Sequence, residues 1–360
     1  NIPLGVHDAE TKVRLEMDVL DNQLTLPEYS LTVSQLSGPV IFDTETGVEE
    51  TTLSGNVFGR PANFTLSSLS REGELEAIYI DSTGMAAIPE LIEWPMQSDF
   101  IADLLRQMSG EFNYTAKLNL NQSSAANSQT FLSIQTDLKG ASSNFPEPFG
   151  KAAQETRPLV LNFGFGENQS VDGRYGESLN FQMDLKGAAV TKGVVYVGSD
   201  SNDLTSLLDS DAPGLVVLGE IPIFNLEQWT SFLESFGGQG ANAAPDDFRD
   251  SLALVDVSVN NFELYDQILP SVAMRIEASQ KIPAWTVRLV SENILGQVDI
   301  PFSENDYLLL NFEYLRLPGD ADVQLASINS FGNDSTGEDM DVSTLQEEIP
   351  IDALVSIDPR

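Results

Sequence analysis

The chain has 360 residues, with 55 acidic against 18 basic side chains, a formal net charge of −37, no cysteine and one histidine. Such a negative field argues against nucleic acid and anionic membrane surfaces as electrostatic partners. The lack of cysteine and the presence of a single histidine, His7, also exclude thiolate nucleophiles, Cys or His zinc sites and almost every histidine-dependent catalytic arrangement.

Alternating apolar and polar residues mark the first strand. Val13, Leu15, Met17 and Val19 alternate with charged residues over 12–20, and a period of two is typical of a strand with one buried face. The pair Asp21-Asn22 predicts a turn. Further strand-like runs follow at 24–33, 40–42, 51–57, 63–67 and 75–80.

Two segments break this pattern with helical spacing. The first covers 98–108, with Ser98 as a plausible N-cap and Gly110 just past its end. The second covers 226–236, where Asn225 can serve as the cap and Trp229 belongs to an apolar stripe. We therefore expect two short helices within a strand-rich chain.

The stretch 131–165 contains two strands joined by a long crossover. A strand-like run at 131–135 ends near Gly140, and a loop with Pro146, Pro148 and Gly150 follows. Alternation resumes at 159–165. Most hairpins need only a few connecting residues, so this crossover is expected to be a built feature of the sheet.

The remaining strand-like runs lie at 112–121, 179–185, 193–198, 215–221, 252–259, 262–265, 272–278, 285–290, 294–300 and 307–317. In total the pattern predicts an all-β protein of roughly 16–20 meandering antiparallel strands. A sheet with one apolar face needs a second sheet, closure into a barrel, or an apolar ligand in an open trough to cover that face. The alternation itself leaves these three open.

Composition also suggests the organisation of the chain. We expect one continuous β segment over 1–330, an acidic mobile loop over 331–348 and the start of a further segment at 349–360. The first residue is Asn1, no signal peptide is visible, and apolar runs are too short to span a bilayer. The chain is thus expected to be a piece of a longer protein.

No constellation of residues indicates an enzyme, and no cofactor is expected. With this many carboxylates, neighbouring acids such as Glu49-Glu50 and Asp246-Asp247 are typical of solvated loops. The acidic groups at 200–211 and 333–341 could offer oxygen ligands to Ca²⁺, but neither has the spacing of a calcium loop. We predict no metal site, and Ca²⁺ binding by these loops stays open.

Several long stretches, taken in order, resemble the YhdP-type branch of the AsmA-like family. They are residues 1–66, from NIPLGVHDAE to PANFTL, then LSIQTDLKGASSNFPEPFGKAAQETRPL, LGEIPIFNLEQWTSFL and WTVRLVSENILGQVDIP. The similarity runs along nearly the whole chain and weakens in 330–348. Its specificity lies in the number and order of these stretches, since none of them is a chemical signature.

This resemblance implies a long, twisted, open U-shaped antiparallel sheet with an apolar interior, a repeating β-groove. It also implies a periplasmic segment of a large protein that is anchored in the inner membrane of a Gram-negative bacterium and reaches the outer membrane. The implied function is non-enzymatic passage of phospholipid between the two membranes. A β-sandwich that acts as an adhesin or binds carbohydrate is the alternative.

In the groove interpretation, alternating apolar residues line the wall. The predicted lining residues are Val13, Leu15, Met17, Val19, Phe112, Tyr114, Leu118, Leu159, Leu161, Phe163, Leu179, Phe181, Met183, Val287, Leu289, Leu308, Leu310 and Phe312. The loop at 144–156 is expected to lie over a rim or an end of the groove. Headgroup preference, transport direction, oligomeric state and protein partners are not predicted.

Overall fold

The computed structural model describes residues 12–26, 30–71, 74–94, 99–121, 130–166, 169–186, 189–198, 214–234, 252–279, 282–302 and 306–317. The chain forms two compact units. Unit 1 comprises Asn1–Phe145, Phe149–Leu215 and Asp247–Ser251, and unit 2 comprises Pro146–Pro148, Val216–Asp246 and Leu252–Arg360. The acidic groups at 200–211 and 333–341, the acidic loop at 331–348 and the segment at 349–360 lie outside the described residues.

The prediction of an open, antiparallel all-β fold is confirmed. The strands of unit 1 are β1 (Arg14–Leu26), β2 (Leu31–Asp43), β3 (Gly47–Val48), β4 (Thr51–Val57), β5 (Arg60–Arg71), β6 (Glu74–Ala87), β7 (Met108–Asn121), β8 (Thr130–Thr136), β9 (Ala141–Ser143), β10 (Leu159–Phe165), β11 (Gln169–Tyr175), β12 (Leu179–Lys186) and β13 (Ala189–Val197). Unit 2 holds nearly all of β14 (Gly214–Asn225), with β15 (Leu252–Leu264), β16 (Gln267–Ala278), β17 (Ala284–Val290), β18 (Ile294–Pro301) and β19 (Leu309–Leu315).

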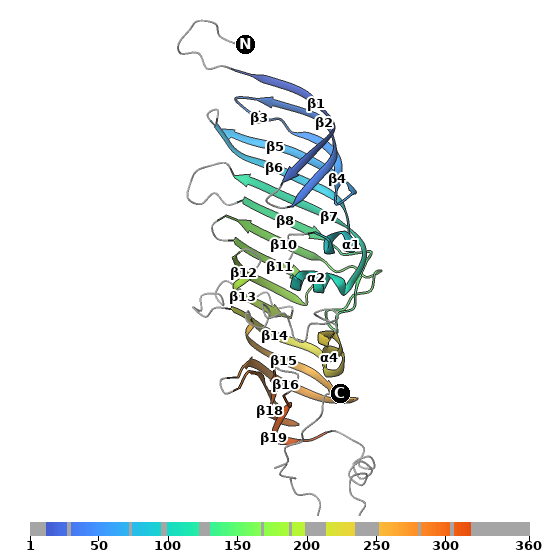
Figure 1. The fold of residues 1–360 in the computed structure, drawn as a ribbon, viewed down its shortest axis with the longest axis vertical. Coiled ribbons are helices and arrows are strands. Elements are labelled where there is room, and N and C mark those ends of the chain that lie inside the picture. Colours follow the sequence, from blue (N-terminus) through green and yellow to red (C-terminus); the bar gives the residue numbers. More distant parts are fainter. Residues whose placement is uncertain are drawn as a thin grey trace, which may run out of the picture. The chain divides into compact units, whose positions relative to one another are not determined.

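One antiparallel ladder runs through unit 1. It joins the strands in the order β1, β2, β4, β5, β6, β7, β8, β10, β11, β12 and β13 (Figure 1). The short strands β3 and β9 pair at the margins, with β2 and with the start of β7. Among the described ladders β1 pairs with β2 alone, so the sheet of this unit is open at β1. A β-sandwich, which needs two stacked sheets, is not what these pairings form.

The predicted turn at Asp21-Asn22 is wrong. β1 continues through these residues, and its register against β2 shifts between Val19 and Asn22 and again between Asn22 and Leu24. Asp21 adopts φ +49°, and Gln35 of β2 adopts φ +52°. A bulge accommodates such a residue while the strand goes on, so the turn-favouring pair produced a bulge here.

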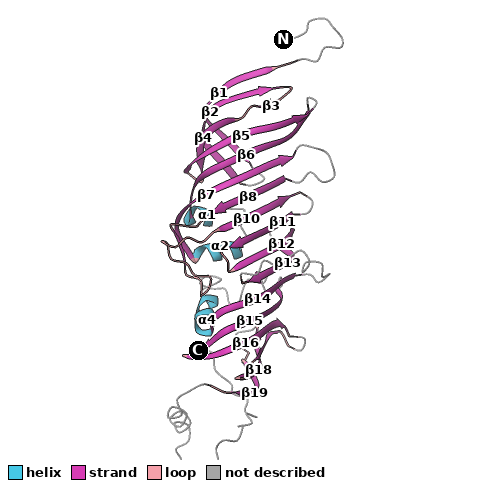
Figure 2. Ribbon diagram, turned by 180° about the vertical axis from the view of Figure 1, so that it is seen from behind, coloured by secondary structure: helices cyan, strands magenta, loops and turns pink. Residues whose placement is uncertain are grey.

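Three helices are described, one more than predicted. α2 (Asp99–Arg106) lies within the expected 98–108, and α4 (Leu226–Glu234) lies within the expected 226–236. The unexpected helix is α1 (Ile88–Ile92), whose first turn contains a proline and Glu90 and whose Ile88 side chain is fully buried. In unit 1, α1 and α2 lie together beside the ends of β6 and β7 (Figure 2).

Unit 2 has a ladder of its own from β15 to β19. Its buried side contains Val257, Val259, Val272 and Met274, and beyond Asn260 the buried positions change parity. Phe262 and Leu269 are then the buried ladder pair. This sheet therefore has a closely packed core on one side.

Candidate functional site

An apolar face shared by eleven strands is the main surface feature of unit 1. In an antiparallel ladder, residues directly opposite each other point to the same side of the sheet. The ladder registers therefore trace single rows across the sheet, such as Ile80, Leu118, Leu132, Phe163, Val171 and Met183. We call the side of the sheet that carries this row the apolar face.

All predicted lining residues of unit 1 that sit in described ladders lie on the apolar face. On β1 they are Leu15, Met17 and Val19, and Val13 precedes the strand with the same parity. On the inner strands they are Phe112, Tyr114, Leu118, Leu159, Leu161, Phe163, Leu179, Phe181 and Met183. The registers thus bring together on one side residues that are up to 170 positions apart in the chain, as 13 and 183 are.

The apolar face is only partly shielded from solvent. Met17 keeps 43% of its surface exposed and Leu15 keeps 47%, and Leu161, Phe163 and Phe181 are half-buried. The core residues of a sandwich would be almost fully buried. An exposed face of this extent is typical of a surface that binds an apolar partner.

The opposite side of the same sheet is polar. Asp81 lies opposite Lys117, and the Asn162 amide donates a hydrogen bond of 2.8 Å to Asp172. Charged side chains are common there, for example Glu16 on β1. The two sides of unit 1 therefore differ sharply in polarity.

Arg60 is the charged residue that the described ladders place on the apolar face. It lies at the first position of β5, opposite Val57. Its guanidinium contacts Glu90 of α1 at 2.8 Å and Glu111 at 3.1 Å. Hydrogen bonding to Glu90 raises the pKa of Arg60. Both carboxylates neutralise this charge at the strand ends and leave the rest of the face uncharged.

The crossover between β8 and β10 is fastened at the strand ends of unit 1. Ser143 and Lys151 form a bridge, and the buried Lys151 ammonium donates to the carbonyl oxygens of Ala141 at 2.6 Å and Ala152 at 3.0 Å. Burial lowers the pKa of Lys151. Strand β9 pairs with the start of β7. Residues 141–145 and 149–152 of the crossover are thus an ordered part of unit 1.

In unit 2 the predicted lining residues share a side but differ in exposure. Val287, Leu289, Leu310 and Phe312 lie on the same side of the ladder as Val257 and Met274. Leu289 is 6% exposed and therefore packs in the core, whereas Val287, Leu310 and Phe312 are half-buried. Leu308 directly precedes β19.

Helix α4 covers one end of this apolar side in unit 2. The ring of Phe224 stacks between Trp229 and Phe262, with centroid distances of 5.5 Å to each. Trp229 also packs edge-on against Phe232 at 5.8 Å. The predicted stripe of α4 is therefore used for packing on the sheet.

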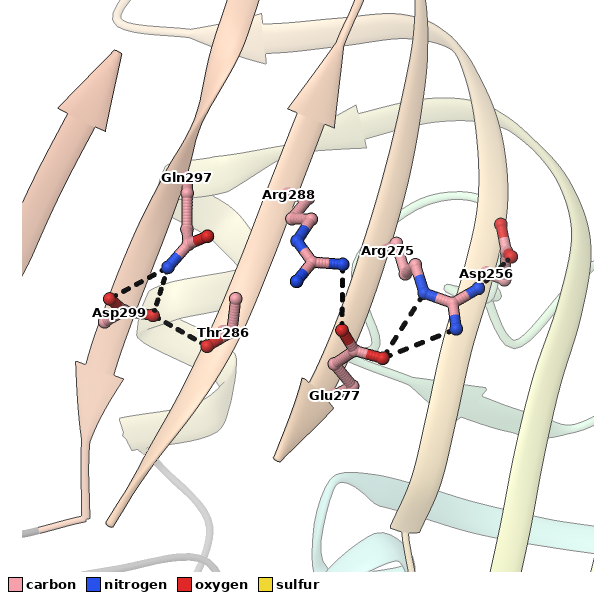
Figure 3. A network of polar contacts seen from close by, with 7 residues as sticks. All are labelled: Asp256, Arg275, Glu277, Thr286, Arg288, Gln297 and Asp299. Atoms are coloured by element: carbon pink, nitrogen blue, oxygen red, sulfur yellow. Dashed lines mark hydrogen bonds and ion pairs between the residues drawn. The ribbon is translucent and has the colours of Figure 1, made fainter. Parts of the chain in front are cut away.

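The other side of unit 2 carries a polar network across β15, β16, β17 and β18 (Figure 3). Arg275 contacts Asp256 at 2.9 Å and Glu277 at 3.4 Å, and Arg288 contacts Glu277 at 3.0 Å. On the next strands Thr286 donates to Asp299 at 2.7 Å, and Gln297 donates to both oxygens of that carboxylate. These groups satisfy one another across the strands, so unit 2 repeats the polarity difference of unit 1.

Sequence reasoning missed part of the apolar face in β4, β5 and β6. Leu53, Phe64, Leu66 and Ile80 lie on it. Serine, threonine and asparagine are frequent in these strands, and the alternation is correspondingly weak. The signal that identifies them is the ladder register, which depends on the neighbouring strands.

The described residues include no group arranged to hold a metal ion and no helix able to cross a bilayer. No group of three or more His, Asp or Glu side chains in the described ranges is arranged to hold a metal ion. None of the helices within those ranges has the length and apolarity to cross a bilayer. The candidate site is the apolar face of unit 1, because it is continuous across the ladder and partly exposed.

Comparison with known proteins gives one match. A family model described as YhdP protein matches residues 1–351. Neither a curated protein nor a solved structure matches the chain.

Proposed function

The chain belongs to the YhdP family, which is related to lipid transport and is not a known enzyme family, and from this premise we propose that it is a non-enzymatic segment of a phospholipid conduit. Acyl chains would lie along the apolar face of unit 1, and headgroups would stay in water. The conduit would lie in the periplasm, as part of a protein anchored in the inner membrane, and carry phospholipid between the inner and outer membranes.

The size of the apolar face supports this proposal. Ten strand-to-strand steps separate β1 from β13 in the ladder, and steps of about 4.8 Å give a path of about 48 Å. One leaflet of hydrocarbon is about 15 Å thick, half of a bilayer core of about 30 Å. The face is thus long enough for more than one acyl chain placed end to end.

The chemistry of the face supports passage without a specific pocket. Each CH₂ group removed from water contributes about 0.8 kcal/mol, wherever along the face it is buried. The ladder residues of the face are uncharged except for Arg60 at one end. A lipid tail can therefore shift across the strands, from one end of the ladder toward the other, without breaking an ion pair.

The observation that carries the proposal is the continuous, partly exposed apolar face of the open sheet in unit 1. A closed sandwich, the scaffold of the carbohydrate-binding alternative, is not formed by the pairings. That alternative predicts binding to glycans in place of phospholipid.

Phospholipid bound to the purified chain provides the test, measured by mass spectrometry after expression in a Gram-negative host. Phe181→Glu places a charge on the apolar face and should lower bound phospholipid several-fold. Gln182→Glu is the matched control, because the neighbouring residue points to the polar side of β12. A wild-type chain that carries no phospholipid, or equal loss in both variants, would contradict the proposal.

A further inference from the structure

Four large side chains on apolar sides of the two units lie directly over a glycine of the neighbouring strand. The ladder pairs are Gly84 with Tyr114, Gly173 with Phe181, Gly193 with Met183, and Gly296 with Phe312. In each pair the large residue is one of the predicted lining residues. We call these four pairs the glycine seats.

The space above each glycine is filled by its partner. A Cβ atom at Gly84 would lie 2.8 Å from the Tyr114 hydroxyl oxygen and 3.0 Å from Cζ. At Gly173 it would lie 2.6 Å from Cζ of Phe181, at Gly193 2.9 Å from Cγ of Met183, and at Gly296 2.1 Å from Cδ1 of Phe312. Any residue other than glycine would therefore displace the partner side chain.

A side chain that leans over glycine projects less from the sheet. In strands, side chains normally stand roughly perpendicular to the sheet, and a large residue opposite another large residue must do so. Tyr114 and Phe181 instead extend sideways across the strand beside them. At the glycine seats the side chains of the apolar face therefore rise less far above the sheet than upright aromatic rings would.

We propose that the glycine seats set the clearance of the lipid path, an inference that rests on the proposed function. Glycine at these positions keeps Tyr114, Phe181 and Met183 down on the sheet of unit 1, and leaves room for an acyl chain above them. Adding a methyl group to the glycine raises the partner into that room. The seats are positioning residues, since they act through their partners.

Gly84 is the best position for a test. The three nearest atoms to its added Cβ all belong to the Tyr114 side chain, whereas Gly173 and Gly296 also approach backbone oxygens, of Val160 at 2.6 Å and of Asn311 at 2.8 Å. Gly84 is not among the glycines with positive φ. Alanine is thus compatible with the backbone there, and the reduced entropy of the unfolded chain favours the folded state.

The experiment compares wild type, Gly84→Ala, Tyr114→Ala and Gly84→Ala/Tyr114→Ala in the purified 360-residue chain. Each protein is incubated with detergent-dispersed dioleoyl phosphatidylethanolamine, and bound lipid per protein is measured by mass spectrometry. Gly84→Ala should bind about fourfold less, which corresponds to one CH₂ group no longer buried. The double variant should bind as much as Tyr114→Ala alone, because there is no ring left for the added methyl group to raise.

Thermal unfolding of the lipid-free proteins distinguishes a loss of space for the acyl chain from a folding defect. We expect Gly84→Ala to unfold at or above the wild-type temperature while it binds less lipid. Equal lipid binding by Gly84→Ala and wild type, or a fourfold loss when Gly84→Ala is added to Tyr114→Ala, would overturn the inference. If Gly84→Ala does not fold, the effect of Gly193→Ala is compared in the wild-type, Met183→Ala and Leu215→Ala backgrounds by the same criteria, because the added Cβ would lie 2.9 Å from Met183 Cγ and 3.0 Å from Leu215 Cδ1.

The two proposals fail in different ways. Absence of phospholipid from wild type would overturn the lipid conduit itself. Phospholipid on wild type and unchanged amounts on both glycine variants would overturn only the role of the glycine seats.

Discussion

The phenolic hydroxyl of Tyr175 donates a 2.9 Å hydrogen bond to the carbonyl oxygen of Phe149. Tyr175 lies on the apolar face between Leu159 and Leu179, so this bond ties the crossover to the end of that face. The Arg157 guanidinium lies over the same ring, 5.2 Å from its centroid. This geometry agrees with a crossover loop at the rim of the apolar face.

Removal of the Tyr175 hydroxyl should loosen the crossover and leave the sheet intact. A neutral hydrogen bond contributes about 1 kcal/mol, and the Phe149 carbonyl would lose its tyrosine donor in Tyr175→Phe. We expect a decrease of this size in unfolding free energy and faster amide exchange at Ser143 and Lys151, whose amides bridge the crossover. Hydrogen exchange with mass spectrometry checks this. Unchanged exchange in the crossover would show that the bond does not hold it.

Replacement of the buried Lys151 should remove two hydrogen bonds of the crossover and one cause of the pH dependence of protein stability. Lys151→Met leaves the Ala141 and Ala152 carbonyls without this donor, at a cost of about 2 kcal/mol. Burial lowers the Lys151 pKa below its ordinary 10.5, so the unfolded chain binds more protons between the folded-state pKa and 10.5. Stability therefore rises with pH across that window in wild type.

The measurement is denaturant unfolding of wild type and Lys151→Met at a series of pH values from neutral to about 10. The variant should lack the part of the rise that Lys151 causes. Lys139→Met is the control, because Lys139 is an exposed lysine of the same crossover. Identical pH profiles for wild type and Lys151→Met would contradict the assignment.

In the polar network of unit 2, one carboxylate contacts two arginines of neighbouring strands and offsets the repulsion between them. Arg275 and Arg288 are direct ladder partners, and Glu277 contacts both. Glu277→Gln should destabilise the unit by about 0.5 kcal/mol, since like charges directly opposite each other repel. Added salt screens exposed charges, so the loss should shrink as NaCl is raised in thermal unfolding. A loss that is independent of salt would exclude this repulsion as its cause.

Asn225 should determine where α4 begins. Its side-chain oxygen accepts a 2.9 Å hydrogen bond from the Gln228 amide, which confirms the predicted cap, and its amide nitrogen donates to Glu263 at 2.8 Å. Asn225→Ala should cost about 1 kcal/mol and expose Trp229. Asn225→Ser retains a cap acceptor and should cost less. A red shift of tryptophan fluorescence in the alanine variant, absent in the serine variant, is the expected reading.

Alternation in the sequence predicted the apolar face best where it was undisturbed, as at Leu15 and Met17 or at Leu179 and Phe181. A period of two assigns residues to sides of one strand without knowledge of its neighbours. The sides of different strands become one surface only through the registers. Those depend on bulges such as the one at Asp21, which a local pattern cannot distinguish from a turn.

Two other features could not be predicted from local sequence patterns, for different reasons. Helix α1 has five residues, too few for a helical period to be recognised. The glycine seats depend on which residue lies opposite on the next strand, and Gly173 and Phe181 have no special spacing in the sequence. The family resemblance predicted the architecture, whereas the individual pairs follow only from the ladder registers.

The single-file order of the strands in unit 1 has a consequence for how such a protein can change its length over evolution. Each strand of the main ladder pairs with the strand before and the strand after it, so the sheet behaves as a one-dimensional array with nearest-neighbour couplings. Duplication of one hairpin would extend the array by about 10 Å and leave every other pairing as it was. Reach could thus be adjusted in increments of two strands, with selection acting on the span to be bridged.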